Sequence, residues 1–229
     1  MKEFLRRFRR YLVFPLGAVT LLWFAPLAPW GSHLFDEIID GVGTLVAVLG
    51  ELLRVWAWGS NATTPKQGVR TRGPYALMRH PLYVGNLLIV FGLLLVYNNP
   101  WAYVICGLPF AVSYGAIARL EEEHMHRTFG DAYAEYAASC AGRFAPALGH
   151  LGRARRTSLP FGWRLAVKKE YESVLGVVAG VIIIEMYEDA RWGGLAGVQG
   201  EFFFLAAVLC ALGALSLGLY IRKARRVVQ

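Results

Sequence analysis

Long apolar stretches, separated by short polar segments, dominate the hydrophobic pattern of the chain. Three of them contain no Asp, Glu, Lys or Arg over their whole length: Tyr11–Trp30, Pro100–Ala118 and Phe202–Ile221. A helix needs roughly 20 apolar residues to cross the hydrocarbon layer of a membrane. We therefore predict a membrane-spanning helix in each of these three stretches.

Three further stretches are apolar but shorter or interrupted by charge: Gly41–Trp58, Leu82–Tyr97 and Ser173–Tyr187. A helical span in each gives an all-α transmembrane bundle of about six spans. The first 30 residues also fit a cleaved signal peptide, because a basic segment precedes their apolar run. We prefer the span, since further apolar segments follow it.

The basic residues are distributed unevenly between the two sides of such a bundle. With six spans and both termini inside, all but two of the 24 lysine and arginine residues lie before the first span, in the inner segments or after the last span. The exceptions are Arg54, near the inner end of its span, and Arg191. Because Lys and Arg are retained in the cytoplasm during insertion, we expect an inner-membrane protein, in a bacterium, whose termini both face the cytoplasm.

Composition supports a membrane protein, and the charge and cysteine patterns argue against nucleic acid and metal ions as partners. Hydrophobic residues make up 56% of the chain and charged residues 17%, and the net charge is +8. The positive charge follows the topology, so attraction to the membrane surface explains it and we expect no nucleic-acid partner. Cys106, Cys140 and Cys210 lack the spacing of a disulfide framework or a zinc site. His124 and His126 point to different sides of a helix, and we expect no metal ligand there.

Two inner segments are long enough to carry chemistry, Gly59–Pro81 and Arg119–Pro160. Helical spacing of apolar and aromatic residues predicts that Arg119–Cys140 is one helix extending the fourth span. The Gly- and Arg-rich stretch Gly142–Arg156 is typical of a loop. We accordingly expect a core over residues 1–160 and a C-terminal pair of spans over residues 161–229.

The first motif with chemical content is the segment from Arg72 to Gly85, with the sequence RGPYALMRHPLYVG. Gly73-Pro74 predicts a turn, and Pro81 keeps His80 out of the helix that follows. Exposed N–H groups at a helix beginning, together with Arg79, suit an anionic group. The alternative is that Arg72, Arg79 and His80 anchor the span at lipid phosphates.

Two sets of acidic residues also stand out. Glu121-Glu122-Glu123 follows a span that basic residues otherwise surround, which indicates a cationic partner, although a solvated helix face is the simpler explanation for Glu123. Glu51 and Arg54, three residues apart in a span, are candidates for function, but we expect them to neutralise one another at the interface.

These motifs occur in an order that resembles the isoprenylcysteine carboxyl methyltransferase and phospholipid methyltransferase family. RHPLYVG at 79–85 is followed by a span and a hairpin, then by Glu121-Glu122, FGDAYAEY at 129–136 and RFAP at 143–146. The resemblance covers residues 70–146. It implies an all-helical membrane enzyme with a cytoplasmic helix and loops that form a pocket for S-adenosylmethionine, and a lipid-like or prenylated acceptor that arrives from the bilayer.

The resemblance also implies roles for residues at matching positions. Catalytic roles fall on Arg79, between cofactor and acceptor, and on Glu122, which would meet the cofactor's amino group. The other residues implied to border the cofactor are Tyr75, His80, Pro81, Tyr83, Gly85, Glu121 and Arg143. The chain departs from the family in its last two spans and in Ala145.

Several alternatives stay open at this point. The acceptor group can be a carboxylate, an amine or a thiol, and only an ammonium acceptor must first lose a proton. A sterol-type membrane reductase that uses NADPH shares a related helical scaffold. A third possibility is a non-catalytic membrane scaffold. The sequence indicates no oligomeric state.

Overall fold

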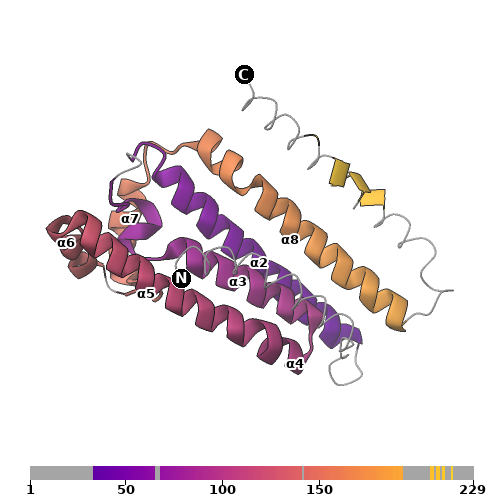
Figure 1. Ribbon diagram of the computed structural model, residues 1–229. Helices are drawn as coiled ribbons and strands as arrows, with labels where there is room; N and C mark the ends of the chain where they lie inside the picture. The colour runs from indigo at the N-terminus through magenta and orange to yellow at the C-terminus, as the bar shows by residue number, and fades with distance from the viewer. Residues whose placement is uncertain are drawn as a thin grey trace. The chain divides into compact units, whose positions relative to one another are not determined.

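The computed structural model describes residues 33–64, 68–140 and 142–192, with a few residues between 207 and 218 (Figure 1). These residues form helices and connecting turns, and no β-strand occurs among them. The chain divides into two compact units, residues 1–170 and 171–229. The predicted all-α class is therefore confirmed for the described part of the chain.

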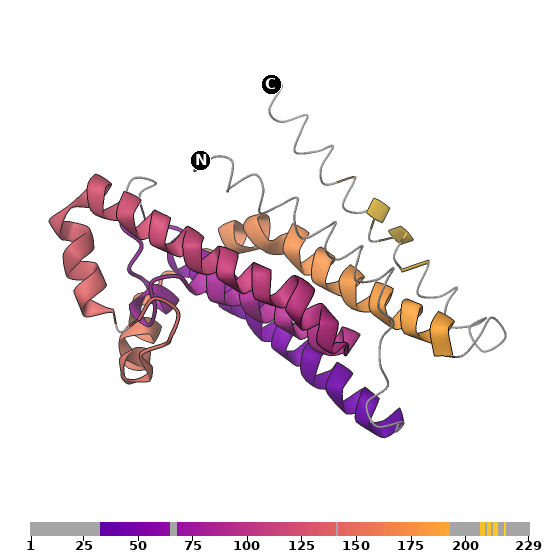
Figure 2. The ribbon, with the colours of Figure 1, turned by 60° about the horizontal axis from the view of Figure 1, so that its bottom comes forward.

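Helices α2 (His33–Ser60) and α3 (Pro81–Tyr97) pack side by side in opposite directions (Figures 1 and 2). Two pairs of glycines make the approach possible. A Cβ atom added to Gly50 would lie 2.6 Å from the carbonyl oxygen of Gly85, and one added to Gly92 would lie 2.5 Å from that of Gly43. Small residues at such positions let two membrane helices come into close backbone contact.

A tight hairpin connects α3 to the next helices, as the Asn98-Asn99-Pro100 sequence predicts. Asn98 ends α3 with a φ of 45°, and its N–H donates to the carbonyl of Leu94 at 3.0 Å. The Asn99 side chain accepts from the N–H of Trp101 at 2.9 Å. The chain continues through α4 (Pro100–Ala102), the π-helical turn η3 (Tyr103–Gly107) and α5 (Leu108–Phe129).

The six predicted spans differ in how far the structure supports them. In the described part of the chain, one continuous helix, Pro100–Phe129, is long and apolar enough to cross a membrane, and Pro81–Tyr97 is apolar but shorter. Helix α2 and helix α8 (Trp163–Trp192) contain the predicted stretches 41–58 and 173–187. Residues 11–30 lie outside the described residues and residues 202–221 lie largely outside them, so the six-span arrangement stays a prediction.

Two local predictions in the second inner segment are wrong. Residues 119–140 do not form one helix, because Gly130, with a φ of 50°, separates α5 from α6 (Asp131–Ser139). Residues 142–156 are not a plain loop, since they include η4 (Leu148–His150) and most of α7 (Leu151–Thr157). Tertiary contact stabilises this short helix, because Ala154 is fully buried in a cluster with Ala76, Leu77 and Met78.

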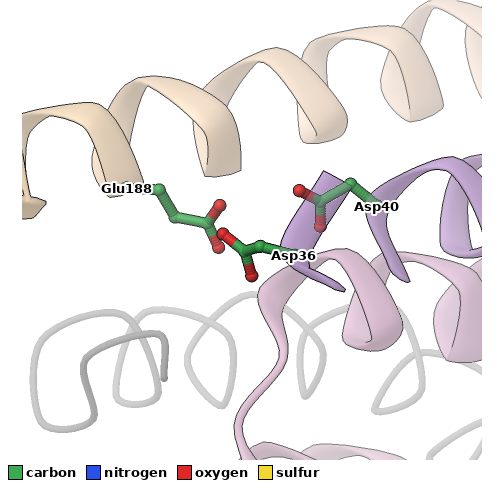
Figure 3. Close-up of side chains that lie close together, drawn as sticks. All are labelled: Asp36, Asp40 and Glu188. Atoms are coloured by element: carbon green, nitrogen blue, oxygen red, sulfur yellow. The ribbon is translucent and has the colours of Figure 1, made fainter. Parts of the chain in front are cut away.

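Some acidic residues stand outside the sequence segment that carries the motifs, residues 70–146. Figure 3 shows Asp36 and Asp40, one turn apart near the beginning of α2 in the first unit, and Glu188 of α8, which belongs to the second unit.

Candidate functional site

The turn before α3 is held by contacts to the end of α7. Gly73 opens the 3₁₀ turn η2 (Gly73–Ala76) with a φ of 60°, and a Cβ there would lie 2.3 Å from Oγ of Ser60. The Arg72 guanidinium donates to the carbonyls of Thr157 at 3.1 Å and Leu159 at 2.5 Å, and to Oγ1 of Thr63 at 2.7 Å. Arg72 thus connects protein segments to one another. The alternative interpretation of the sequence places this side chain at lipid phosphates.

The segment from Leu77 to His80 pairs with the loop after α6. The N–H groups of Arg79 and His80 donate to the carbonyls of Gly142 and Arg143, both at 3.1 Å. The N–H of Ala147 donates to the carbonyl of Leu77 at 3.0 Å. As predicted, His80 stands on non-helical backbone (φ −125°, ψ 58°) and α3 begins at Pro81. These backbone bonds bring together the motifs at 79–85 and 143–146, which lie far apart in the sequence.

Glu122 is the centre of the resulting cluster of side chains. Its carboxylate accepts two hydrogen bonds from Arg143, from Nε at 3.0 Å and from the terminal nitrogen at 2.6 Å. Nε2 of His80 lies 3.1 Å away, and Nε of Arg79 lies 3.3 Å away. Burial opposes ionisation, but Arg143, Arg79 and His80 together outweigh it and lower the pKa of Glu122. The two sequence motifs therefore meet through an ionised, buried carboxylate.

His80 is held between this carboxylate and the rings around it. Its ring stacks on Tyr83, with centroids 5.2 Å apart and an angle of 4° between the planes. Burial lowers the pKa of His80, although both neighbouring glutamates oppose that shift. A carboxylate can only accept a hydrogen bond, so Nε2 of the neutral ring carries the proton toward Glu122. Nδ1 is then an acceptor, 3.8 Å from the Glu121 carboxylate.

Glu121 differs from Glu122 in both exposure and partners. Its side chain is 47% exposed, whereas that of Glu122 is 10% exposed. The hydroxyl of Tyr83 donates a hydrogen bond to it. Of the two adjacent carboxylates, Glu121 is therefore the one accessible to a ligand.

A cavity of about 790 Å³ opens beside this cluster. Such a volume suits a small-molecule cofactor. Its wall combines basic, acidic and aromatic side chains from the turn before α3 and from α3, α5 and α6: Arg70, Tyr75, Arg79, His80, Tyr83, Glu121, His124, Met125, Phe129, Tyr133 and Tyr136, with Gly68, Val69, Leu82 and Thr128 between them. The hydroxyl of Tyr136 donates to the carbonyl of Tyr75 at 2.9 Å, which ties α6 to η2.

The structure separates the predicted site residues into three groups. Those that line the cavity are Tyr75, Arg79, His80, Tyr83 and Glu121. Glu122 does not line the cavity but contacts His80 and Arg79 of its wall, and the Arg143 side chain contacts Glu122. Pro81 is buried at the first turn of α3, and Gly85 faces α2, where an added Cβ would lie 2.5 Å from Cγ of Arg54.

Sequence reasoning missed several residues of the cavity wall. Arg70 also stacks over Trp58, with its guanidinium carbon 4.5 Å from the ring centroid. Met125, Phe129, Tyr133 and Tyr136 stand at helical spacing in the sequence, a pattern that indicates a helix but does not indicate a cavity wall. Burial raises the pKa of Tyr133 to about 12, so its hydroxyl is protonated at neutral pH.

Arg54 has a partner that its sequence neighbourhood does not indicate. Glu51 lies 3.9 Å from Nε of Arg54, so the predicted pair is present at the edge of an ion-pair distance. The closer partner is Glu170, on the first turns of α8, whose carboxylate accepts from the Arg54 guanidinium at 2.8 and 2.5 Å.

The described part of the chain is helical, and one of its helices is long and apolar enough to cross a membrane. A charged cavity of a size that suits a cofactor lies beside the end of that helix, and this combination indicates the class of helical membrane proteins. Residues 41–132 match the family model described as phospholipid methyltransferase. The match confirms the family resemblance that the ordered motifs carry, and it includes Arg79, His80 and both glutamates of the site.

Two relatives are named for resistance to metal ions. The chain is 32% identical over 108 residues to the cobalt-zinc-cadmium resistance protein CzcN of Cupriavidus metallidurans, an alignment that covers 47% of this chain and 50% of the relative. It is 26% identical over 172 residues to the nickel-cobalt-cadmium resistance protein NccN of Alcaligenes xylosoxydans xylosoxydans, covering 71% and 76%. The chain thus spans half the length of the first relative. No solved structure matches the chain.

Proposed function

We propose that this protein transfers a methyl group from S-adenosylmethionine to a lipid-like or prenylcysteine-like acceptor at the cytoplasmic face of the bacterial inner membrane. One observation carries the proposal. The two family motifs meet around Glu122 and place basic, acidic and aromatic side chains on the wall of one cavity. The family match over residues 41–132 supports the same reaction class.

The side chains of the cavity fit the amino acid end of the cofactor, which is a zwitterion. Arg79 lines the cavity and its side chain is 23% exposed, so its guanidinium suits a carboxylate while its Nε pairs with Glu122 at 3.3 Å. The accessible carboxylate of Glu121 and the acceptor atom Nδ1 of His80 suit an ammonium group. The aromatic rings of Tyr75 and Tyr133 offer surfaces for the adenine.

In this arrangement Glu122 acts by positioning. Its carboxylate already accepts both hydrogen bonds of Arg143 and lies against His80, so it holds the wall in place while Glu121 meets the ligand. This assignment modifies the role that the family resemblance implies for Glu122, namely contact with the amino group. The bound cofactor supplies an electrophilic methyl group, and the protein's tasks are alignment and exclusion of water.

A titration with S-adenosylhomocysteine tests the proposal. We expect saturable binding by the purified protein in detergent or nanodiscs, weakened by Glu121→Gln and unchanged by Glu123→Gln. Glu123 is exposed and does not line the cavity, so it is a matched control on the same helix turn. No saturable binding to folded wild-type protein would end the proposal.

Thermal stabilisation of the protein by added ligand distinguishes the reductase alternative from the methyltransferase, because a ligand of the native state raises the apparent stability. Stabilisation by NADPH and not by S-adenosylhomocysteine would favour reduction. Incubation of a lipid extract with the protein and a labelled methyl donor would then identify the acceptor as a carboxylate, an amine or a thiol.

The names of the two relatives suggest a cellular role in tolerance of divalent metal ions. We propose that methyl transfer serves such a role here, and growth of a deletion strain on cobalt, zinc and cadmium tests it. Complementation by wild type but not by Glu121→Gln is expected. Equal complementation by both, with equal amounts of folded protein in the membrane, would favour the non-catalytic scaffold.

A further inference from the structure

A partly buried polar network runs from helix α8 toward the cavity. Glu170, which is 1% exposed, accepts two hydrogen bonds from Arg54 of α2. Arg54 also donates to the side-chain oxygen of Asn86 in α3. The Asn86 amide nitrogen donates in turn to the hydroxyl of Tyr114 in α5 at 2.8 Å. Four helices are thus joined by three consecutive polar contacts.

The network reaches the ligand-facing carboxylate through two tyrosines. The ring of Tyr114, 5% exposed, packs edge-on against Tyr83 with centroids 5.1 Å apart. Tyr83 stacks on His80 and donates its hydroxyl proton to Glu121. The position of Tyr114 therefore sets where Tyr83 stands, and Tyr83 in turn fixes both cavity groups that suit an ammonium ion.

We infer that Glu170 is a positioning residue of the cofactor site and acts through Arg54, Asn86 and Tyr114. Charged groups in the apolar part of a helical bundle are costly and persist where they are paired for a purpose. Removing the Glu170 charge leaves Arg54 without its closest carboxylate. We expect the Arg54 side chain then to change its conformation and to lose its hydrogen bond to Asn86. The inference rests on the proposed function, and it gives the beginning of α8 a part in the site.

The test compares Glu170→Gln with Glu172→Gln in the full-length protein. Glu172 lies half a turn further along α8 and is exposed, which makes it a matched control. We expect Glu170→Gln to weaken S-adenosylhomocysteine binding by on the order of tenfold, equivalent to about 1.4 kcal/mol. In turnover assays the KM for S-adenosylmethionine should rise while kcat changes little, since the network does not touch the reacting atoms.

A second measurement needs no ligand. Amide hydrogen exchange should become faster in Glu170→Gln over the first turns of α3 and around Tyr114, and stay unchanged in α6. Unaltered binding and unaltered exchange in Glu170→Gln would overturn the inference while leaving the proposed function intact. If wild-type protein binds no S-adenosylhomocysteine, the proposed function fails and the exchange measurement alone decides whether the network positions Tyr83.

Discussion

Arg143 and Glu122, 21 residues apart, form a two-point contact in which both carboxylate oxygens accept from one guanidinium, at 3.0 and 2.6 Å. The planar fork of arginine matches a carboxylate in a way that a lysine ammonium cannot. Because the backbone carbonyl of Arg143 also accepts from His80, this one residue connects the loop after α6 to α5 and to the beginning of α3.

The Arg143→Lys substitution should therefore destabilise the protein although it keeps the charge. We expect a loss of about 1.5–3 kcal/mol, the scale of one hydrogen bond to a charged group. Unfolding in detergent micelles measures it, and Arg153→Lys is the control, since Arg153 is exposed on α7. Equal stability of Arg143→Lys and wild type would show that charge alone holds the loop.

Stability should fall as the pH drops below the ordinary pKa of histidine, 6.5, because burial lowers the pKa of His80 in the folded state. In that range the unfolded chain binds a proton that the folded chain resists, so unfolding becomes more favourable. The pKa of Glu122, also lowered, acts in the same direction but only below its ordinary value of 4.5. The two effects therefore occupy separate pH windows.

Thermal unfolding of wild type and His80→Gln at about pH 7.5 and about pH 5.5 measures the histidine effect. Glutamine can still donate to Glu122 but does not titrate. The variant should lose less thermal stability between the two pH values than wild type does. Identical losses would mean that His80 does not resist protonation in the folded state.

Gly85→Ala and Gly115→Ala should have opposite effects on stability. A Cβ on Gly85 would lie 2.8 Å from the backbone carbonyl of Gly50, so we expect overpacking to cost about 1–3 kcal/mol. Nothing lies within 4 Å of a Cβ on Gly115, and alanine there should stabilise α5 by about 0.5–1 kcal/mol. Denaturant titration measures both. Equal stability of the two variants would contradict the close packing of α2 against α3.

The contacts of Gly85 differ from the role that the family resemblance implies for it. The resemblance implies that Gly85 borders the cofactor, whereas the contacts of this residue are to Gly50 and Arg54 on α2. Binding measurements on Gly85→Ala decide between the two roles. Loss of stability without loss of affinity for S-adenosylhomocysteine would assign Gly85 to helix packing.

Local sequence patterns predict the helical class, the turn at Gly73, the hairpin at Asn98 and the non-helical position of His80. Each of these depends on local chemistry: the hydrophobic period, the φ values open to glycine and asparagine, and the restriction that proline places on the residue before it. The break at Gly130 was missed, because a single glycine within a helical pattern does not show from sequence alone whether the chain bends there.

Which charged groups meet depends on the packing of the helices and does not follow from the local sequence. The spacing of Glu51 and Arg54 favours a local pair, yet the closest carboxylate to Arg54 comes from Glu170, 116 residues away. Glu121 and Glu122 are equivalent in the sequence, and they differ because successive positions on α5 point in different directions. One faces the cavity and the other is enclosed by Arg143 and His80. Pairing between distant segments depends on how the helices pack, and a local sequence pattern does not predict that packing.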